Sequence, residues 1–325
     1  MEMKLTINRA FRAPSRNGIL AAAERLGDIP RVTPLLSLPE LGGGIALKAE
    51  SLQLGGAFKL RGAYNRLAQV APADRARGVV AFSSGNHAQG VARAARLLGM
   101  PAAIVMPADA PRVKLEATAA LGAEIIPYDR ATESREAIAA RLAEERGAVL
   151  LPSFDDVDVV EGQGTVGLEA ERQYGAPIAR VVVPCGGGGL AAGISLALPD
   201  AEIIIVEPEG WDDMGRSLKL GRIVPVEPAA PATACDALQT TRVAEITFGA
   251  LHQAGARGLS VSEAEVRAAM RYAYSLGLVV EPGGAVALAA LLAGKVAADG
   301  ATTLVVASGS NVDPAAFARV IGGAG

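Results

Sequence analysis

Short apolar runs alternate with longer, helix-like segments along most of the chain. Each run is bounded by turn-forming residues and lacks the polar alternation of a strand that has one face in water. Such runs are typical of strands that are buried on both faces of a parallel sheet. They predict strands at 78–82, 102–106, 124–127, 149–151, 180–183, 202–206 and 303–307.

The segments between these runs carry apolar residues at helical spacing. Residues 132–146 place theirs on one face, and Gly147 follows as a stop. Ser262 and Glu265 have the spacing of a capping box, which predicts a helix that begins there and ends at Gly277. The alternation of strands and helices predicts an α/β protein, in which residues from about 70 to 150 form a compact subdomain.

The composition excludes several classes of function. The 325 residues include 31 Lys and Arg against 34 Asp and Glu, a net charge of −3 without a basic run, so we expect no nucleic-acid partner. Two cysteines cannot build a disulfide framework, and two histidines cannot build a zinc site of the usual kind.

No segment predicts a membrane partner or a targeting signal. The first 16 residues carry charges and lack the apolar core of a signal peptide. Residues 181–199 are uncharged, but Pro184 and four consecutive glycines divide them into a strand, a loop and a helix. We therefore expect a cytoplasmic protein.

Glycine is the unusual component, with 38 residues, and four of them are consecutive at Gly186–Gly189. The run follows a predicted strand and precedes a helix-like segment. Glycines let backbone N–H groups converge, and a helix N-terminus adds positive potential, so the run predicts a phosphate site. A tight glycine-rich turn is the alternative. The spacing Gly186-x-Gly188-x-x-Ala191 also fits a dinucleotide-binding loop, in which Glu207 would bind a ribose.

Lys59 is one of six lysines and lies between Phe58 and Leu60, after an uncharged stretch. A lysine in apolar surroundings has a lowered pKa and can act as a nucleophile or form a Schiff base. An ordinary lysine whose stem is buried and whose ammonium group reaches water is the alternative.

A second candidate anion site follows the predicted strand at 78–82. Ser83, Ser84 and Asn86 precede a helix that begins near His87, and the backbone amides at such a position suit a carboxylate. An ordinary N-cap cluster is the alternative, because Ser and Asn are favoured there. A histidine such as His87, taken alone, favours a structural role.

Four segments together resemble a known family. Ala57-Phe-Lys-Leu-Arg-Gly-Ala63, Ser83-Ser-Gly-Asn-His-Ala-Gln89, Gly186–Gly189 and Ser308-Gly-Ser-Asn311 are similar, in order and spacing, to the hallmark segments of the fold type II pyridoxal-phosphate enzymes. The branch they resemble contains the serine and threonine dehydratases and serine racemase. The resemblance implies two open, twisted, mostly parallel sheets with helices on both faces. It also implies a small domain, 70–151, inserted in a large cofactor-binding domain formed by 1–69 and 152–325.

The resemblance implies a role for each matching residue at the cofactor. Lys59 would form the Schiff base with pyridoxal 5'-phosphate, and Phe58 would pack beside its ring. The backbone amides of Gly186, Gly187, Gly188 and Gly189 would hold the phosphate. Asn86 would hydrogen-bond the phenolic oxygen, Ser308 would meet the pyridine nitrogen, and Glu281 would border the cofactor. A neutral hydroxyl such as that of Ser308 does not force protonation of the ring, which favours expulsion of a β-leaving group over a long-lived carbanion.

The resemblance also implies a substrate site. Ser83, Ser84, Gly85 and His87 would bind the substrate carboxylate, and Ser84 would be the second acid–base of racemising members. Arg135 would lie near the mouth of the site. Ala57 and Ser310 stand where relatives usually have Ser or Thr and Gly, respectively, so the identity of the substrate stays open.

The acidic loop from Glu207 to Asp213 allows a further interpretation. The resemblance implies a divalent-cation site made of the carboxylates of Glu207 and Asp213 and the carbonyl of Trp211. Hard oxygen ligands of this kind suit Mg²⁺ or Ca²⁺. A solvated acidic loop is the alternative. If Glu207 is a cation ligand, it is not the acid that binds a ribose.

These observations predict a homodimeric enzyme that uses pyridoxal phosphate to eliminate the β-hydroxyl of a small amino acid. L-threonine or L-serine would give a 2-oxo acid and ammonia. A serine-type racemase, a 3-hydroxyaspartate dehydratase and a β-replacement synthase are alternatives within the family. A dinucleotide-dependent oxidoreductase would leave Lys59 unexplained, and a non-catalytic binding module would need neither Lys59 nor Ser308.

Overall fold

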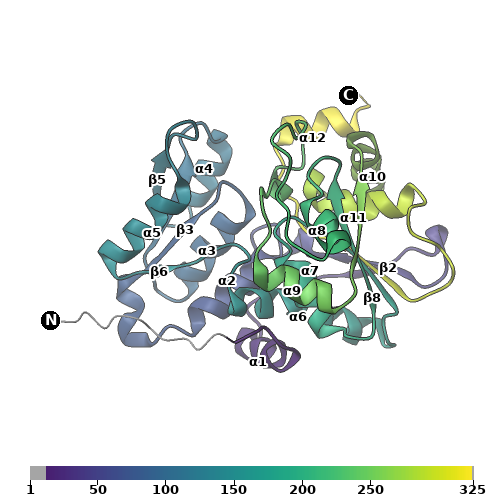
Figure 1. Cartoon of the computed structure of the whole chain (residues 1–325), viewed down its shortest axis with the longest axis horizontal. Helices are drawn as coiled ribbons and strands as arrows, with labels where there is room; N and C mark the ends of the chain where they lie inside the picture. The colour runs from purple at the N-terminus through teal and green to yellow at the C-terminus, as the bar shows by residue number, and fades with distance from the viewer. Residues whose placement is uncertain (1–11, 324–325) are drawn as a thin grey trace.

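The computed structural model describes residues 12–323, which form two sheets that lie side by side with helices around both (Figure 1). The strands are β1 (Leu35–Ser37), β2 (Ile45–Ala49), β3 (Val79–Phe82), β4 (Ala102–Pro107), β5 (Glu124–Tyr128), β6 (Val149–Leu150), β7 (Arg180–Pro184), β8 (Glu202–Pro208), β9 (Arg257–Val261) and β10 (Thr303–Ala307). The helices are α1 (Arg16–Leu26), α2 (Lys59–Ala68), α3 (Asn86–Leu97), α4 (Arg112–Ala119), α5 (Arg135–Arg146), α6 (Val157–Tyr174), α7 (Gly189–Ala197), α8 (Asp213–Leu220), α9 (Glu245–Gln253), α10 (Glu263–Ser275), α11 (Pro282–Leu292) and α12 (Pro314–Ile321).

The two sheets draw their strands from different parts of the chain. The four-stranded sheet has the order β5-β4-β3-β6, is parallel throughout and uses only strands between residues 79 and 150. The six-stranded sheet has the order β1-β2-β10-β7-β8-β9, and its edge strand β1 is antiparallel to β2. The predicted α/β architecture with mostly parallel sheets is therefore confirmed, and the domain boundaries at 70 and 151 stay a prediction.

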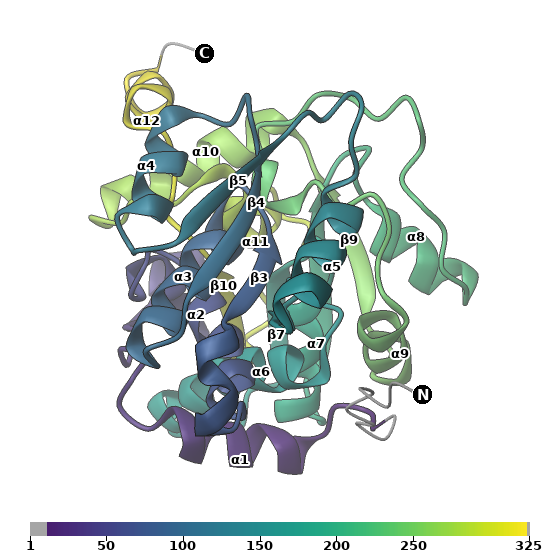
Figure 2. The same ribbon diagram turned by 90° about the vertical axis from the view of Figure 1, so that its left-hand side faces the viewer.

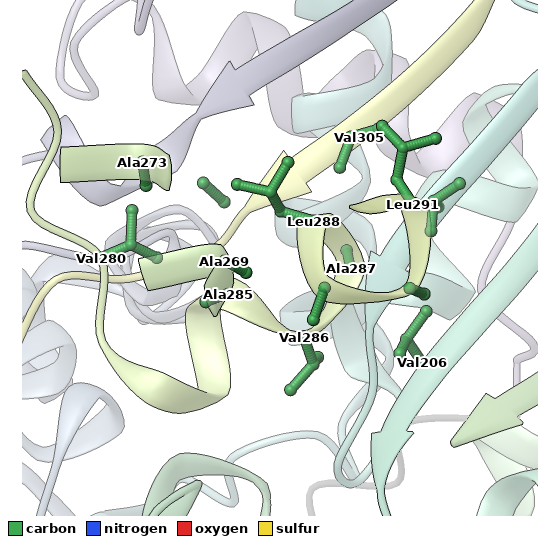
Figure 3. Packing of buried hydrophobic residues seen from close by; sticks show 14 of the residues in the cluster. Val206, Ala269, Ala273, Val280, Ala285, Val286, Ala287, Leu288, Leu291 and Val305 are labelled. Atoms are coloured by element: carbon green, nitrogen blue, oxygen red, sulfur yellow. The ribbon is translucent and has the colours of Figure 1, made fainter. Parts of the chain in front are cut away.

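Strand alternation divides the core of the six-stranded sheet into two apolar clusters. In β7, Val181 and Val183 pack on the side of α6, α7 and α9, whereas Val182 packs on the side of α10 and α11. Figure 3 shows the second cluster around α11, beside the strands that carry Val206 and Val305. Burial on both faces explains why these strands are apolar at consecutive positions.

The four-stranded sheet is covered in the same way. Val80 and Val105 pack with residues of α5 on one face, and Val79 and Ile104 pack with residues of α2 and α3 on the other. Figure 2 shows α5 on the opposite side of this sheet from α3. Among residues 12–323, no helix has the length and apolarity needed to cross a membrane.

Helix ends follow the local capping chemistry. Gly147 ends α5 in the left-handed conformation, and Ser262 and Glu265 form the predicted capping box of α10. The start predicted for the first of these helices, residue 132, is wrong by three residues. The side chain of Ser134 accepts a hydrogen bond from the backbone N–H of Ala137, so α5 begins at Arg135.

Candidate active site

A cavity of about 400 Å³ lies where segments that follow β3, β6, β7 and β10 converge. The carboxyl ends of parallel strands are the usual place for ligand sites in α/β folds. The cavity brings together all residues that the sequence assigned to catalysis, cofactor or substrate: Phe58, Lys59, Ser83, Ser84, Gly85, Asn86, His87, Arg135, Gly186, Gly187, Gly188, Gly189 and Ser308.

Lys59 is the first residue of α2 and projects its amine into this cavity. The Nζ atom donates a hydrogen bond to the Ser153 carbonyl (3.2 Å) and lies 5.1 Å from the centre of the Phe58 ring. Burial lowers the pKa of Lys59 to about 8, although the carboxylate of Glu281 opposes the shift. An amine with this pKa is neutral in about a tenth of molecules at pH 7, far more often than an ordinary lysine, and the neutral form is the one that a nucleophile or a base requires.

The four glycines form the turn between β7 and α7. Gly188 is the N-cap of α7 with a φ of 84°, and no side chain caps the helix. The first N–H groups of α7 therefore have no side-chain acceptor and are available to an anion. A Cβ atom on Gly187 would lie 2.2 Å from the ring of Phe154, so the close approach of this wall requires glycine.

A methyl group on Gly187 tests this phosphate cradle. In Gly187→Ala the Phe154 ring must move into the cavity or displace the loop, and we expect pyridoxal-phosphate affinity to fall at least about tenfold. The measurement is a titration of the cofactor-free protein by visible absorbance. Gly249→Ala is the control, because a Cβ atom there meets no atom within 4 Å. Unchanged affinity in Gly187→Ala would contradict the assignment.

The loop between β3 and α3 has the form of an anion site. Gly85 is the N-cap of α3, and no side chain caps this helix. The Ser83 hydroxyl accepts a hydrogen bond from the Gly85 N–H (3.2 Å). The hydroxyl of Ser84 lines the cavity and has no hydrogen-bond partner within residues 12–323. The loop can thus offer a ligand both backbone N–H groups and one hydroxyl.

His87 is held as a neutral ring at the base of the same loop. Burial and the neighbouring Lys59 lower its pKa to about 3. Its Nε2 lies 3.0 Å from the Leu151 carbonyl oxygen, which accepts a hydrogen bond only if Nε2 carries the proton. The buried Nδ1 is then an acceptor, so the ring of His87 offers no proton to a carboxylate. The part of this residue suited to substrate binding is its backbone N–H.

Ser308 directly follows β10 and is buried in the cavity wall. Its carbonyl accepts a hydrogen bond from the Phe58 N–H (3.3 Å), and an isolated bridge pairs Ala57 with Gly309. These bonds join the end of β10 to the start of α2, so the backbones that carry Ser308 and Lys59 are held next to each other.

Arg135 reaches the cavity from the first turn of α5. Its Nε donates to the Glu136 carboxylate (2.8 Å), and its guanidinium lies 5.6 Å from the centre of the Phe82 ring. Its side chain is 43% exposed, and the terminal amino groups have no hydrogen-bond partner within the described chain. They are free to bind an anionic group.

The predicted cation ligands lie outside this cavity, between β8 and α8. The Glu207 carboxylate accepts hydrogen bonds from the backbone N–H groups of Met214 (3.0 Å) and Gly215 (2.8 Å). It therefore anchors the start of α8 and does not face a ribose site. Both carboxylate oxygens of Asp213 are buried without a hydrogen-bond partner in residues 12–323, and burial raises the pKa of Asp213 to about 7.

Buried carboxylate oxygens such as those of Asp213 have the chemistry of hard-cation ligands, whereas both oxygens of Glu207 already accept backbone hydrogen bonds. The described part of the chain holds no group of three or more His, Cys, Asp or Glu side chains that could bind a metal. The Mg²⁺ or Ca²⁺ site consequently stays a prediction.

Two parts of the cavity wall were missed by the sequence analysis. Residues 152–155, including Phe154, follow β6 in the same way that the Ser83 loop follows β3. Their position after a predicted strand could have identified them as part of the cavity wall. Residues 236–244 form the other part, and no strand directly precedes them. Nothing in the local sequence pattern distinguishes this irregular segment.

Comparison with known proteins agrees with this geometry. Residues 27–309 match the family described as "Pyridoxal-phosphate dependent enzyme", which is most of the chain. This chain belongs to that family.

Several relatives of this pyridoxal-phosphate dependent enzyme cover almost its whole length. The L-threo-3-hydroxyaspartate ammonia-lyase of Pseudomonas sp is 42% identical, over 95% of this chain and 99% of that protein. The structure of maize serine racemase has a TM-score of 0.89 at 34% identity and covers 96% of this chain and 98% of its own. The structure of the T.th. threonine deaminase has a TM-score of 0.84 at 40% identity, with 92% and 99% covered.

Membership in this family confirms the fold type II assignment, within the branch of serine and threonine dehydratases and serine racemase, and the cofactor. The residues present fit pyridoxal phosphate, since a lysine of lowered pKa faces a glycine turn at an uncapped helix start. The names of the relatives support β-elimination chemistry. The alternative of a dinucleotide-dependent oxidoreductase is thereby excluded.

Proposed function

We propose that this enzyme is an ammonia-lyase for 3-hydroxyaspartate, with L-threonine and L-serine as poorer substrates. The observation that carries the proposal is the position of Arg135 at the cavity, beside the Ser83–His87 loop. Its Nε is paired with Glu136, but its terminal amino groups have no hydrogen-bond partner within the described chain. A second carboxylate on the substrate gives these amino groups a partner, whereas the methyl group of threonine or the hydrogen of serine does not. The 42% identical relative named for this substrate supports the same choice.

Several cavity residues would take part in this reaction. Bound pyridoxal phosphate would supply the electron sink that acidifies the Cα–H bond of the amino acid. The N–H groups of Gly186–Gly189 would hold its phosphate, and Ser308 and Asn86 would contact the ring nitrogen and the phenolic oxygen. The α-carboxylate of the substrate lies at the start of α3, where backbone N–H groups and the Ser84 hydroxyl are available.

Lys59 provides the proton transfer. Its amine, with a pKa of about 8, would take the Cα proton, and the resulting Lys59 ammonium would give that proton to the β-hydroxyl, which leaves as water. Hydrolysis of the resulting enamine gives a 2-oxo acid and ammonia. The hydroxyl of Ser84, which lines the cavity, would be the second acid–base that a racemase needs.

The resemblance to the family carries four other predictions: a cation site, a small domain, a homodimer and a cytoplasmic location. Glu207, Asp213 and the Trp211 carbonyl would hold Mg²⁺ or Ca²⁺ at the start of α8, outside the cavity. The small domain of residues 70–151, the homodimer and the cytoplasmic location also stay predictions.

The proposal is tested by substrate preference. We expect kcat/KM for L-threo-3-hydroxyaspartate to exceed that for L-serine or L-threonine at least about tenfold, because one charge-assisted hydrogen bond has that effect. Arg135→Met removes the preference, and Arg141→Met on the exposed side of α5 is the matched control. The assays measure 2-oxo acid, ammonia and D-amino acid.

Several outcomes would contradict the proposal. A wild-type enzyme that prefers L-threonine or L-serine is a dehydratase of the neutral hydroxy amino acids. An enzyme that yields mainly D-serine from L-serine is a racemase. Preference retained in Arg135→Met would show that another group binds the second carboxylate.

A further inference from the structure

A chain of side-chain hydrogen bonds runs along the cavity wall beside Lys59. It begins at the backbone carbonyl of Gly55, which accepts a hydrogen bond from Asn311 Nδ2 (2.8 Å). The same Nδ2 donates to Asn86 Oδ1 (2.7 Å). Asn86 Nδ2 then donates to Glu281 Oε1 (2.5 Å). Four segments are joined in this way: the loop before α2, the loop after β10, the start of α3 and the residue before α11.

The direction of each bond in this chain is fixed by its first acceptor. A backbone carbonyl can only accept, so the amino group of Asn311 must face Gly55. The second hydrogen of that amino group then requires an acceptor, which places the carbonyl oxygen of Asn86 toward Asn311. The amino group of Asn86 consequently faces Glu281. A flipped Asn86 amide would place its amino group against the amino group of Asn311, with no acceptor between them.

This arrangement leaves one hydrogen of the Asn86 amino group unused. Asn86 Oδ1 is occupied by Asn311, and one Nδ2–H is occupied by Glu281. Since Asn86 lines the cavity, this remaining N–H is a donor that it can offer to a ligand. A donor is the group that the electron-rich phenolic oxygen of pyridoxal phosphate requires.

Two glycines are needed for these contacts. A Cβ atom on Gly309 would lie 2.0 Å from Glu281 Oε1 and 3.0 Å from Asn86 Nδ2. A Cβ atom on Gly56 would lie 2.5 Å from Asn311 Oδ1. Glycine at these two positions therefore leaves the space that the hydrogen-bonded side chains occupy. A contact between exposed, mobile side chains would not require such space.

Glu281 lies deep enough to act as a fixed acceptor. It is 3% exposed, and burial raises its pKa to about 8. The charged groups that act on it are Lys59 of α2, Lys114 of α4 and Asp236 in the irregular segment that lines the cavity. A carboxyl group retains an accepting oxygen in both protonation states, so Asn86 has its partner throughout.

We propose that Glu281 and Asn311 are positioning residues that hold the Asn86 amide with an N–H directed to the phenolic oxygen of the cofactor. The inference rests on the proposed function, which gives Asn86 its contact with the cofactor. Glu281 and Asn311 act through Asn86 and contact neither cofactor nor substrate in this role. The hydrogen bond to Asn86 gives the buried carboxyl group of Glu281 a role beside the reactive lysine.

The test compares variants that keep or remove the acceptor at residue 281. Cofactor-free wild-type protein, Glu281→Gln, Glu281→Ala, Asn86→Ala and the double variant Asn86→Ala/Glu281→Ala are titrated with pyridoxal 5'-phosphate. Affinity and the visible absorption band of the bound cofactor are recorded. We expect Glu281→Ala to weaken binding about tenfold and to shift the band as Asn86→Ala does. Glu281→Gln retains an accepting oxygen and stays within about threefold of wild type.

The double variant separates a positioning role from a direct one. If Glu281 acts through Asn86, Glu281→Ala changes the affinity less than about twofold in the Asn86→Ala background. A full additional loss in that background, or wild-type affinity and absorption in Glu281→Ala, overturns the inference. Should Glu281→Ala fail to fold by circular dichroism, Asn311→Ala cuts the chain at its other end and is expected to give the same shift. An unshifted band in Asn311→Ala also overturns the inference.

These outcomes differ from failure of the proposed function. A wild-type enzyme that binds pyridoxal phosphate but does not eliminate 3-hydroxyaspartate refutes the proposed substrate and leaves the Asn86 measurements valid. A wild-type enzyme that eliminates 3-hydroxyaspartate, together with an unchanged Glu281→Ala, refutes the positioning role alone.

Discussion

Replacement of Lys59 by alanine is expected to lower ammonia-lyase activity by at least about 10⁴-fold, because the base and the covalent anchor of the cofactor are lost together. The amine lies inside the cavity with a pKa lowered to about 8, and burial is the main cause of that shift. The rate of 2-oxo acid formation is the first measurement. The second is borohydride reduction of the protein with bound cofactor, followed by peptide mapping.

The mapping identifies the reactive amine independently of activity. In the wild type, we expect the reduced cofactor on the peptide that carries Lys59 and on no other peptide. Lys219→Ala is the control, because Lys219 is exposed on α8. Labelling of another lysine in the wild type, or wild-type activity in Lys59→Ala, would contradict the assignment of the catalytic amine.

The second large effect is expected on the free energy of unfolding. It comes from the buried ion pair between Glu50 and Arg61, a residue of α2. Glu50 accepts hydrogen bonds from Arg61 Nε (2.9 Å), Arg61 Nη2 (2.8 Å) and Thr33 Oγ1 (2.6 Å). Both charged side chains are almost completely buried. Glu50→Ala leaves the Arg61 guanidinium buried with Glu169 as its remaining carboxylate, and we expect the free energy of unfolding to fall by about 3–5 kcal/mol.

Denaturant-induced unfolding measures this loss. The matched control is Glu116→Ala, which breaks the exposed pair with Arg112 and is expected to change stability by less than about 1 kcal/mol. Equal losses of unfolding free energy in the two variants would show that the buried pair stabilises the protein no more than the exposed pair. Since Arg61 lies in the first turn of α2, Glu50→Ala is also expected to loosen the position of Lys59.

All seven predicted strands are present with ends within about two residues. Five of them, β3, β4, β7, β8 and β10, are buried almost throughout, which explains their uninterrupted apolar runs. The edge strands β5 and β6 are only partly buried and were recognised by their short apolar runs alone. The strands β1, β2 and β9 were missed. Lys48 interrupts the apolar run of β2, although its ammonium group is buried and binds the Glu169 carboxylate (2.5 Å). A partner so distant along the chain leaves no local signal.

The residues of the candidate site also fall into those that the sequence predicts and those that it does not. Gly186–Gly189, the Ser83 loop and Lys59 were predictable because each carries its own chemistry within a few residues of a strand or helix end. The wall formed by Phe154 and the acceptor role of Glu281 arise only when segments far apart in sequence meet. Local patterns thus indicate the groups that react, and tertiary contacts determine how those groups are held.

The central position of β10 has a consequence for the order of folding during synthesis. This strand lies between β2 and β7, yet it occupies residues 303–307. The four-stranded sheet is complete at residue 150 and can form early, whereas the larger sheet keeps two unpaired strand edges until β10 leaves the ribosome. Lys59 therefore meets Ser308 only after nearly the whole chain has been made, and the nascent protein has to protect those edges in the meantime.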